Sequence, residues 1–108
     1  MIPLVVNNLI AIADLCRTHG IQMLDLFGSA ATATDDSAAN DVDLICDLGT
    51  YEPGVADRLF SFATALEQLL GKPVDLMTVP MIRNPYFRQA IDEQRVRIYE
   101  ARDRQAAA

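Results

Sequence analysis

Apolar residues recur at helical spacing near the start of the chain. Pro3 suits a first helical turn, and the stripe that follows it consists of Val5, Leu9, Ile12, Ala13 and Cys16. Gly20 then follows as a stop signal, with His19 in the last turn. The pattern predicts one helix from Pro3 to His19.

Four short runs have the character of β-strands. Residues 41–48 alternate most cleanly, and the side chains expected on one face of that strand are Asp41, Asp43, Ile45 and Asp47. The other runs are Ile21–Phe27, Val74–Val79 and Arg95–Tyr99, the last of which we expect at a sheet edge. Between the first two strands, residues 30–40 are small or polar and predict a loop.

Two more helices complete the pattern. An amphipathic stripe runs from Leu59 to Leu70 and is closed by Gly71, and a short helix begins at Asn84 and Pro85. The longer helix suffices for a crossover, so the strands on either side of it should be parallel neighbours. The order α-β-β-α-β-α-β predicts an α/β (α+β) fold, with a small mixed sheet flanked by helices.

The charge balance is acidic. Nine Lys and Arg against 15 Asp and Glu give a formal net charge of −6. This argues against direct binding of nucleic acid or an anionic membrane surface, because both require a basic surface. A metal ion or a basic protein surface is a better match as partner.

Length and composition predict one soluble domain. The chain has 108 residues, of which 51% are hydrophobic, and we expect a single domain over 1–100 with a frayed tail at 101–108. Cys16 and Cys46 suggest neither a disulfide framework nor a zinc site. The uncharged start of the chain is too short to span a bilayer, so the expected setting is the cytoplasm.

Three aspartates form the strongest chemical signal. Asp41 and Asp43 are two residues apart on one strand, which places them on one face about 6.5 to 7 Å apart. Asp75 joins that face if the third strand pairs beside the second. Carboxylates in this arrangement suit Mg²⁺ and metal-assisted phosphoryl or nucleotidyl transfer, with one of them deprotonating the attacking hydroxyl.

Gly28 and Ser29 follow the end of the first strand. A glycine permits close approach of the backbone to a ligand, and backbone N–H groups with a serine hydroxyl can hold phosphate oxygens. The order of this turn, the paired aspartates and a third aspartate after a crossover helix is more specific than any of the three alone.

These motifs resemble a known family. Leu26-Phe27-Gly28-Ser29, Asp41-Val42-Asp43-Leu44 and Val74-Asp75-Leu76 are similar to the minimal nucleotidyltransferase (MNT) domain, a small polymerase-beta-like palm. Asn84-Pro85-Tyr86-Phe87 and Arg97-Ile98-Tyr99-Glu100 are similar to the tail of that family, so the resemblance covers about residues 4–100.

The resemblance implies an antitoxin of a HEPN/MNT toxin–antitoxin pair. Such a protein would move AMP from ATP, with Mg²⁺, onto a tyrosine of a HEPN-domain RNase toxin and so silence it. By motif match, Asp41, Asp43 and Asp75 would be the catalytic and metal-binding carboxylates, and Gly28 and Ser29 would hold the nucleotide phosphates.

A second hypothesis is neutralisation of the toxin by binding alone. The family usually carries an arginine soon after the serine, whereas this chain has Ala30-Ala31-Thr32-Ala33 and no Lys or Arg from Thr18 to Asp57. Arg83 or Arg88 are, by position, candidates to reach the phosphates instead. A third hypothesis is a free-standing enzyme acting on a small hydroxyl compound such as an aminoglycoside.

Overall fold

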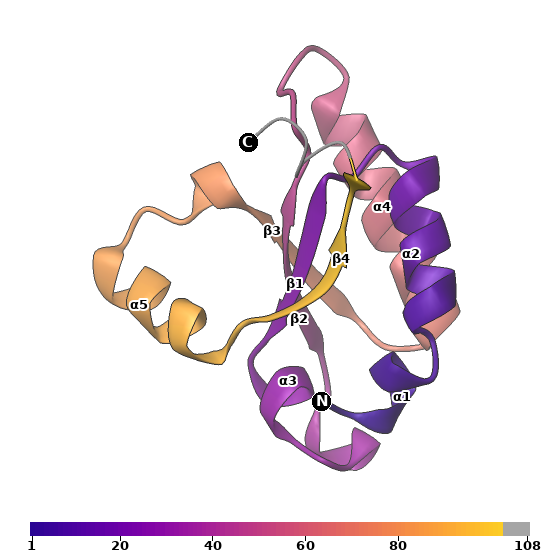
Figure 1. Cartoon of the computed structure of the whole chain (residues 1–108), viewed down its shortest axis with the longest axis vertical. Helices are drawn as coiled ribbons and strands as arrows, with labels where there is room; N and C mark the ends of the chain where they lie inside the picture. The colour runs from indigo at the N-terminus through magenta and orange to yellow at the C-terminus, as the bar shows by residue number, and fades with distance from the viewer. Residues whose placement is uncertain (103–108) are drawn as a thin grey trace.

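The computed structural model describes residues 1–102, and within them one four-stranded sheet lies between two groups of helices (Figure 1). The principal elements are α1 (Pro3–Val6), α2 (Leu9–Thr18), β1 (Met23–Phe27), α3 (Ser29–Thr32), β2 (Val42–Asp47), α4 (Val55–Leu70), β3 (Val74–Thr78), α5 (Pro85–Gln94) and β4 (Val96–Glu100). The predicted α/β architecture and order of main elements are confirmed. Residues 103–108, most of the expected tail, lie outside the described residues.

The strands follow the order β3-β2-β1-β4. β1 pairs antiparallel with both β2 and β4, and β2 pairs parallel with β3 through the crossover helix α4. The predicted parallel pair and the edge position of the last strand are therefore confirmed. The motif-bearing strands β1, β2 and β3 lie side by side.

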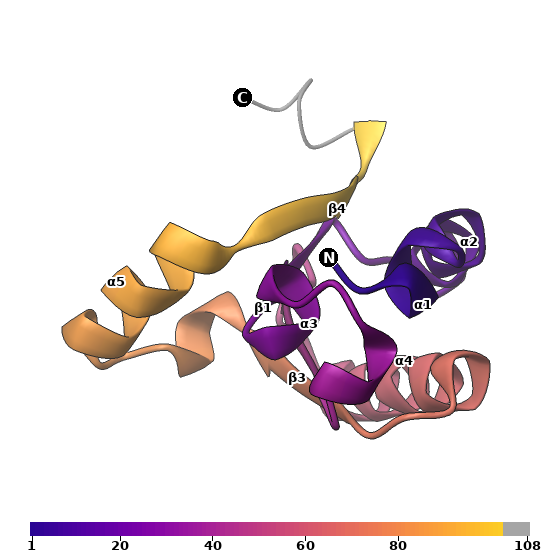
Figure 2. The ribbon, with the colours of Figure 1, turned by 90° about the horizontal axis from the view of Figure 1, so that it is seen from below.

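The two faces of the sheet are covered unequally. α2 and α4 lie on one face and α5 on the other (Figure 2). The larger core packs under the first pair of helices and includes the β2 side chains Val42, Leu44 and Cys46. On the opposite face a small cluster joins Ile45 of β2 to Phe27 of β1 and Ile91 of α5. The predicted alternation along β2 is correct, and each face of β2 contributes side chains to a different hydrophobic cluster.

The first helix is interrupted, contrary to the single helix expected from Pro3 to His19. α1 ends at Val6 and α2 begins at Leu9, with Asn7 and Asn8 between them. The Asn8 side-chain Nδ2 donates to the Leu4 carbonyl at 2.8 Å. Asparagine side chains compete with the backbone for hydrogen bonds, which explains the break.

The segment predicted as a loop, 30–40, contains helical turns. α3 covers Ser29–Thr32, and a 3-10 turn covers Asp36–Ala38. Asp36 anchors this segment, because its Oδ1 accepts from the Leu4 backbone N–H at 2.8 Å. Lys72 Nζ also donates to the Asp36 carbonyl at 2.6 Å. Hydrogen bonds to Leu4 and to Lys72 thus fix the connection between β1 and β2.

No helix within residues 1–102 is both long and apolar enough to cross a membrane.

Candidate functional site

Two of the predicted carboxylates face each other across adjacent strands. Asp43 of β2 and Asp75 of β3 are partners in the parallel register. Asp41, which we expected inside the strand, stands one residue before β2. Asp43 is half-buried, whereas Asp41 and Asp75 are exposed, so the carboxylates form an open acidic surface rather than an enclosed one.

The environment of Asp43 opposes its ionisation. Burial raises the pKa of the Asp43 carboxyl, and the nearby charges of Asp75 and Asp41 raise it further. A cation between these groups would lower the cost of the negative charges. The raised pKa of Asp43 and the two neighbouring carboxylates together make this place a candidate site for a positive ion.

The donor set suits Mg²⁺ in part. Among residues 1–102, no three His, Cys, Asp or Glu side chains are grouped closely enough to hold a metal ion by themselves. Mg²⁺, however, is usually bound by one or two carboxylates, and water and substrate phosphates complete its shell. The facing pair Asp43 and Asp75, with Asp41 one residue before β2, fits that mode of binding.

The glycine–serine turn lies directly against the Asp43 carboxylate. Phe27, the last residue of β1, pairs with Asp43, and the next residue is Gly28, with φ of +68°. A Cβ added to Gly28 would lie 2.5 Å from Asp43 Oδ2. Ser29 begins α3 and is exposed. The structure thus brings Gly28 and Ser29 to the same end of the sheet as Asp43.

Gly28→Ala should therefore damage both the fold and the site. The positive φ strains any L side chain, and the new methyl would displace the Asp43 carboxylate. We expect a loss of about 1–3 kcal/mol in the free energy of unfolding, measured by urea denaturation. Gly54→Ala is the matched control, because Gly54 also has positive φ but a Cβ there meets nothing within 4 Å. Equal losses in both variants would show that Asp43 is not crowded by residue 28.

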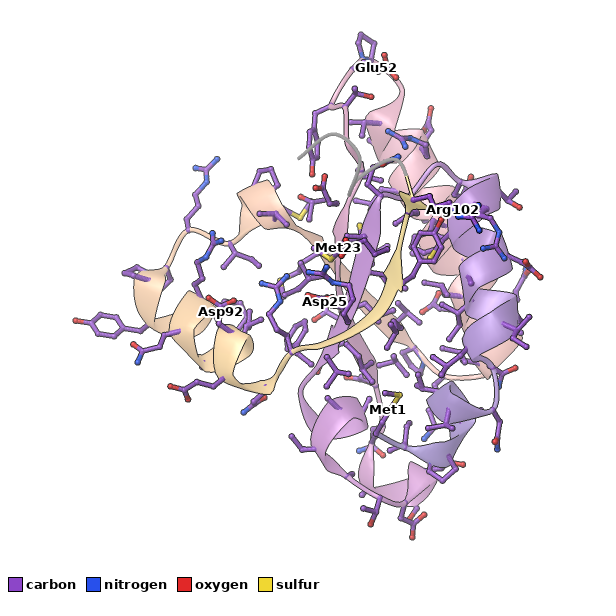
Figure 3. All side chains as sticks on the ribbon, in the orientation of Figure 1. Met1, Met23, Asp25, Glu52, Asp92 and Arg102 are labelled. Carbon is purple, nitrogen blue, oxygen red and sulfur yellow. The ribbon has the colours of Figure 1, made fainter. Side chains whose placement is uncertain are left out.

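A buried ionic cluster on this face was not predicted from the sequence. Asp25 of β1 is 1% exposed, and its carboxylate accepts from Arg95 Nε at 2.6 Å and from Arg97 Nε at 2.5 Å. Figure 3 shows Asp25 with nitrogen-bearing side chains around it, between the sheet and α5. Asp25 pairs with Ile45, so it lies on the same face of the sheet as Asp43. An aspartate inside the apolar run of β1 was the signal available in the sequence.

The sequence favoured Arg83 or Arg88 as the arginine nearest the phosphates. Arg88 is exposed on α5, where its Nε lies 3.9 Å from Asp92. Arg95 and Arg97 are the arginines bound to a carboxylate of the sheet, that of Asp25, and the role of Arg83 or Arg88 stays a prediction. Within residues 1–102 these groups line no enclosed pocket, and Asp41, Asp75 and Arg88 are exposed whereas Asp25 is buried.

The chain belongs to the nucleotidyltransferase domain family, whose sequence profile matches residues 10–98. A relative from Methanocaldococcus jannaschii, MJ1217, is named as a proposed protein adenylyltransferase. It is 33% identical over 84 residues, which are 78% of this chain and 83% of the relative.

Solved structures share the fold. One described as a proposed minimal nucleotidyltransferase has a TM-score of 0.66 and 26% identity, covering 85% of this chain and 90% of that one. A Shewanella oneidensis complex of an MNT antitoxin with a tri-AMPylated HEPN toxin has a TM-score of 0.63 and 18% identity, covering 94% and 77%. A toxin–antitoxin structure with AMP-PNP has a TM-score of 0.66 and 21% identity, covering 93% and 79%.

Proposed function

We propose that this protein is an antitoxin that uses ATP and Mg²⁺ to transfer AMP to a tyrosine of a HEPN-domain toxin. The observation that carries the proposal is the contact of the Gly28 turn with Asp43, which itself faces Asp75. The adenylyltransferase name of the relative and the AMPylated toxin in a structural neighbour support it.

Each proposed site residue has a defined task. The backbone N–H groups of the Gly28–Ser29 turn and the Ser29 hydroxyl hold phosphate oxygens of ATP. Mg²⁺ would be held by Asp41, Asp43 and Asp75 jointly with water and phosphate oxygens, and it would neutralise phosphate charge and orient the phosphates. The close packing of Asp43 against Gly28 keeps its carboxylate next to the phosphates.

Asp75 is the proposed base. It is the exposed member of the facing pair, so the tyrosine hydroxyl of a protein substrate can reach it. Asp75 accepts the hydroxyl proton as the tyrosine oxygen forms a bond to the α-phosphorus of ATP. The bond from the α-phosphorus to its bridging oxygen breaks, and pyrophosphate leaves with that electron pair.

The deciding experiment is intact mass spectrometry of the HEPN toxin after incubation with this protein, ATP and Mg²⁺. We expect the toxin to gain the mass of one or more AMP units and to lose RNase activity in parallel. Omission of Mg²⁺ tests the metal requirement. Replacement of ATP by AMP-PNP tests whether the analogue also donates AMP, because its bridge between the α- and β-phosphates is the same as in ATP. No gain in mass under the complete conditions would contradict the proposed transfer.

Neutralisation by binding alone is the second candidate. α3 carries no basic side chain, and the surrounding stretch is acidic, which suits the basic surface of an RNase. A toxin that is inactive in a stable complex on a sizing column, with unchanged mass, would support this candidate in place of AMP transfer.

A further inference from the structure

Phosphates that approach this face of the sheet meet several carboxylates. The basic residues nearest in sequence to these carboxylates donate their hydrogen bonds to main-chain carbonyls. Lys72 donates to the Asp36 and Ala39 carbonyls. Arg58 donates to main-chain carbonyls that include those of Gly20 and Thr50. A substrate with several negative charges needs other cations, because metal ions and backbone amides offset only part of its repulsion from the carboxylates.

An irregularity in β4 turns an arginine toward the carboxylate face. The pairing of β1 with β4 shifts by one residue between Leu24 and Asp25, so that Leu24 faces Tyr99 but Asp25 faces Arg97. Ile98 and Tyr99, though adjacent, both pack against the larger core. Such bulges re-aim side chains and are common beside active sites. Here the shift places Arg97 opposite Asp25.

Asp25 holds two guanidinium groups in fixed positions. Arg95 and Arg97 each donate their Nε to a different oxygen of this buried carboxylate. Their Nη1 atoms donate to Asp92 and Glu100 respectively. Within residues 1–102 the Nη2 atoms of both arginines make no hydrogen bond, so each guanidinium is oriented but keeps free donors. Arg97 is 44% exposed at its side chain and Arg95 is 21% exposed.

The arginine pair lies close to the candidate site. Asp25 is two residues before Phe27 on β1, about 7 Å along the strand, and Phe27 is the partner of Asp43. Val96 pairs with Leu26, which brings the backbone of Arg95 to the end of β1 where Gly28 follows. An arginine side chain spans this distance, and its planar fork of donors suits phosphate oxygens.

We propose that Arg95 and Arg97, oriented by Asp25, bind the polyphosphate group of a nucleoside triphosphate at this face of the sheet. The pair supplies guanidinium donors close to α3, which has no basic side chain of its own. The inference rests on the proposed use of ATP and assigns a second set of residues to the same substrate. Asp25 acts as a positioning residue, since its buried carboxylate touches the arginines and not the phosphates.

The test is isothermal titration of the full chain with AMP-PNP in the presence of Mg²⁺, compared with adenosine, which has no phosphate. We expect Arg97→Gln and Arg95→Gln each to weaken AMP-PNP binding about tenfold or more, because each removes a charge-assisted hydrogen bond. Binding of adenosine should stay unchanged. Arg17→Gln is the matched control, because Arg17 lies on α2 and pairs with exposed Asp14.

Arg97→Lys keeps the charge and tests the pair if either glutamine variant fails to fold. It should bind AMP-PNP more weakly than the natural chain, because an ammonium cannot donate to Asp25 and to phosphate in the same planar geometry. Unchanged AMP-PNP binding in the arginine variants would overturn this inference alone. Equal weakening of adenosine and AMP-PNP would assign the arginines a purely structural role and overturn it as well. If the natural chain binds no AMP-PNP with Mg²⁺, both this inference and the proposed transfer are wrong.

Discussion

An Asp43→Asn variant should reduce the proposed AMP transfer by about 10³-fold, because it lacks a carboxylate at the proposed metal and phosphate site. The same variant should be slightly more stable than the natural chain. Asp43 faces Asp75 directly, and like charges in that register destabilise a sheet by about 0.5 kcal/mol. Activity lost while stability rises would separate a functional carboxylate from a structural one. Transfer is measured by intact mass and stability by urea unfolding.

The pH dependence of the free energy of unfolding is an independent test of the raised pKa of Asp43. The pKa of Asp43 is higher in the folded chain than in the unfolded chain, so the folded state binds the proton more tightly. Its contribution to stability is present at low pH and is lost as pH rises through the raised pKa. In EDTA, the natural chain should therefore lose stability over that range more steeply than Asp43→Asn, and Mg²⁺ should restore it.

Asp57→Asn is the control for these measurements. Asp57 belongs to the same acidic stretch of sequence but lies exposed in the first turn of α4. The substitution removes the same charge, and AMP transfer should persist. Loss of transfer in Asp57→Asn, or full transfer in Asp43→Asn, would contradict the assignment of Asp43 to the site.

Asp25→Asn should lower the free energy of unfolding, although it is a conservative change. The carboxylate is 1% exposed and accepts from two arginines, so its neutralisation leaves Arg95 and Arg97 with only their more exposed partners, Asp92 and Glu100. Because both arginines are partly exposed and keep a second carboxylate, we expect a loss of about 1–3 kcal/mol in the free energy of unfolding. The midpoint of urea unfolding should fall accordingly, with an unchanged slope.

Asp14→Asn is the matched control for Asp25→Asn. It breaks an aspartate–arginine pair of similar length, 2.6 Å between Arg17 Nη2 and Asp14 Oδ1, but both side chains are more than half exposed. Exposed pairs contribute little, so we expect a change of at most about 0.5 kcal/mol. If both variants unfold at the same urea concentration, burial does not distinguish the two pairs.

The motif residues could be placed from the sequence because local patterns determine them. Alternation along residues 41–48 puts Asp43 opposite the face of Val42 and Leu44, and the crossover length of α4 makes β2 and β3 parallel. The proximity of Gly28 to Asp43 was expected only from resemblance, and it depends on the register of β1 with β2, which pairs Phe27 with Asp43. The break at Asn8 and the turns within 30–40 depend on side-chain hydrogen bonds that periodicity does not reveal.

The ionic cluster of Asp25, Arg95 and Arg97 could not be predicted from the sequence. Periodicity and spacing describe residues a few positions apart, and from them the strands, the crossover and the shared face of the aspartates follow. Asp25 meets Arg95 and Arg97 across 70 and 72 residues, through a one-residue shift in the pairing of β1 with β4. No local pattern encodes that shift, which accompanies the packing of both Ile98 and Tyr99 against the larger core. The carboxylates of the candidate site could therefore be identified from the sequence, whereas the arginines beside them could be identified only from the tertiary structure, in which β4 pairs with β1.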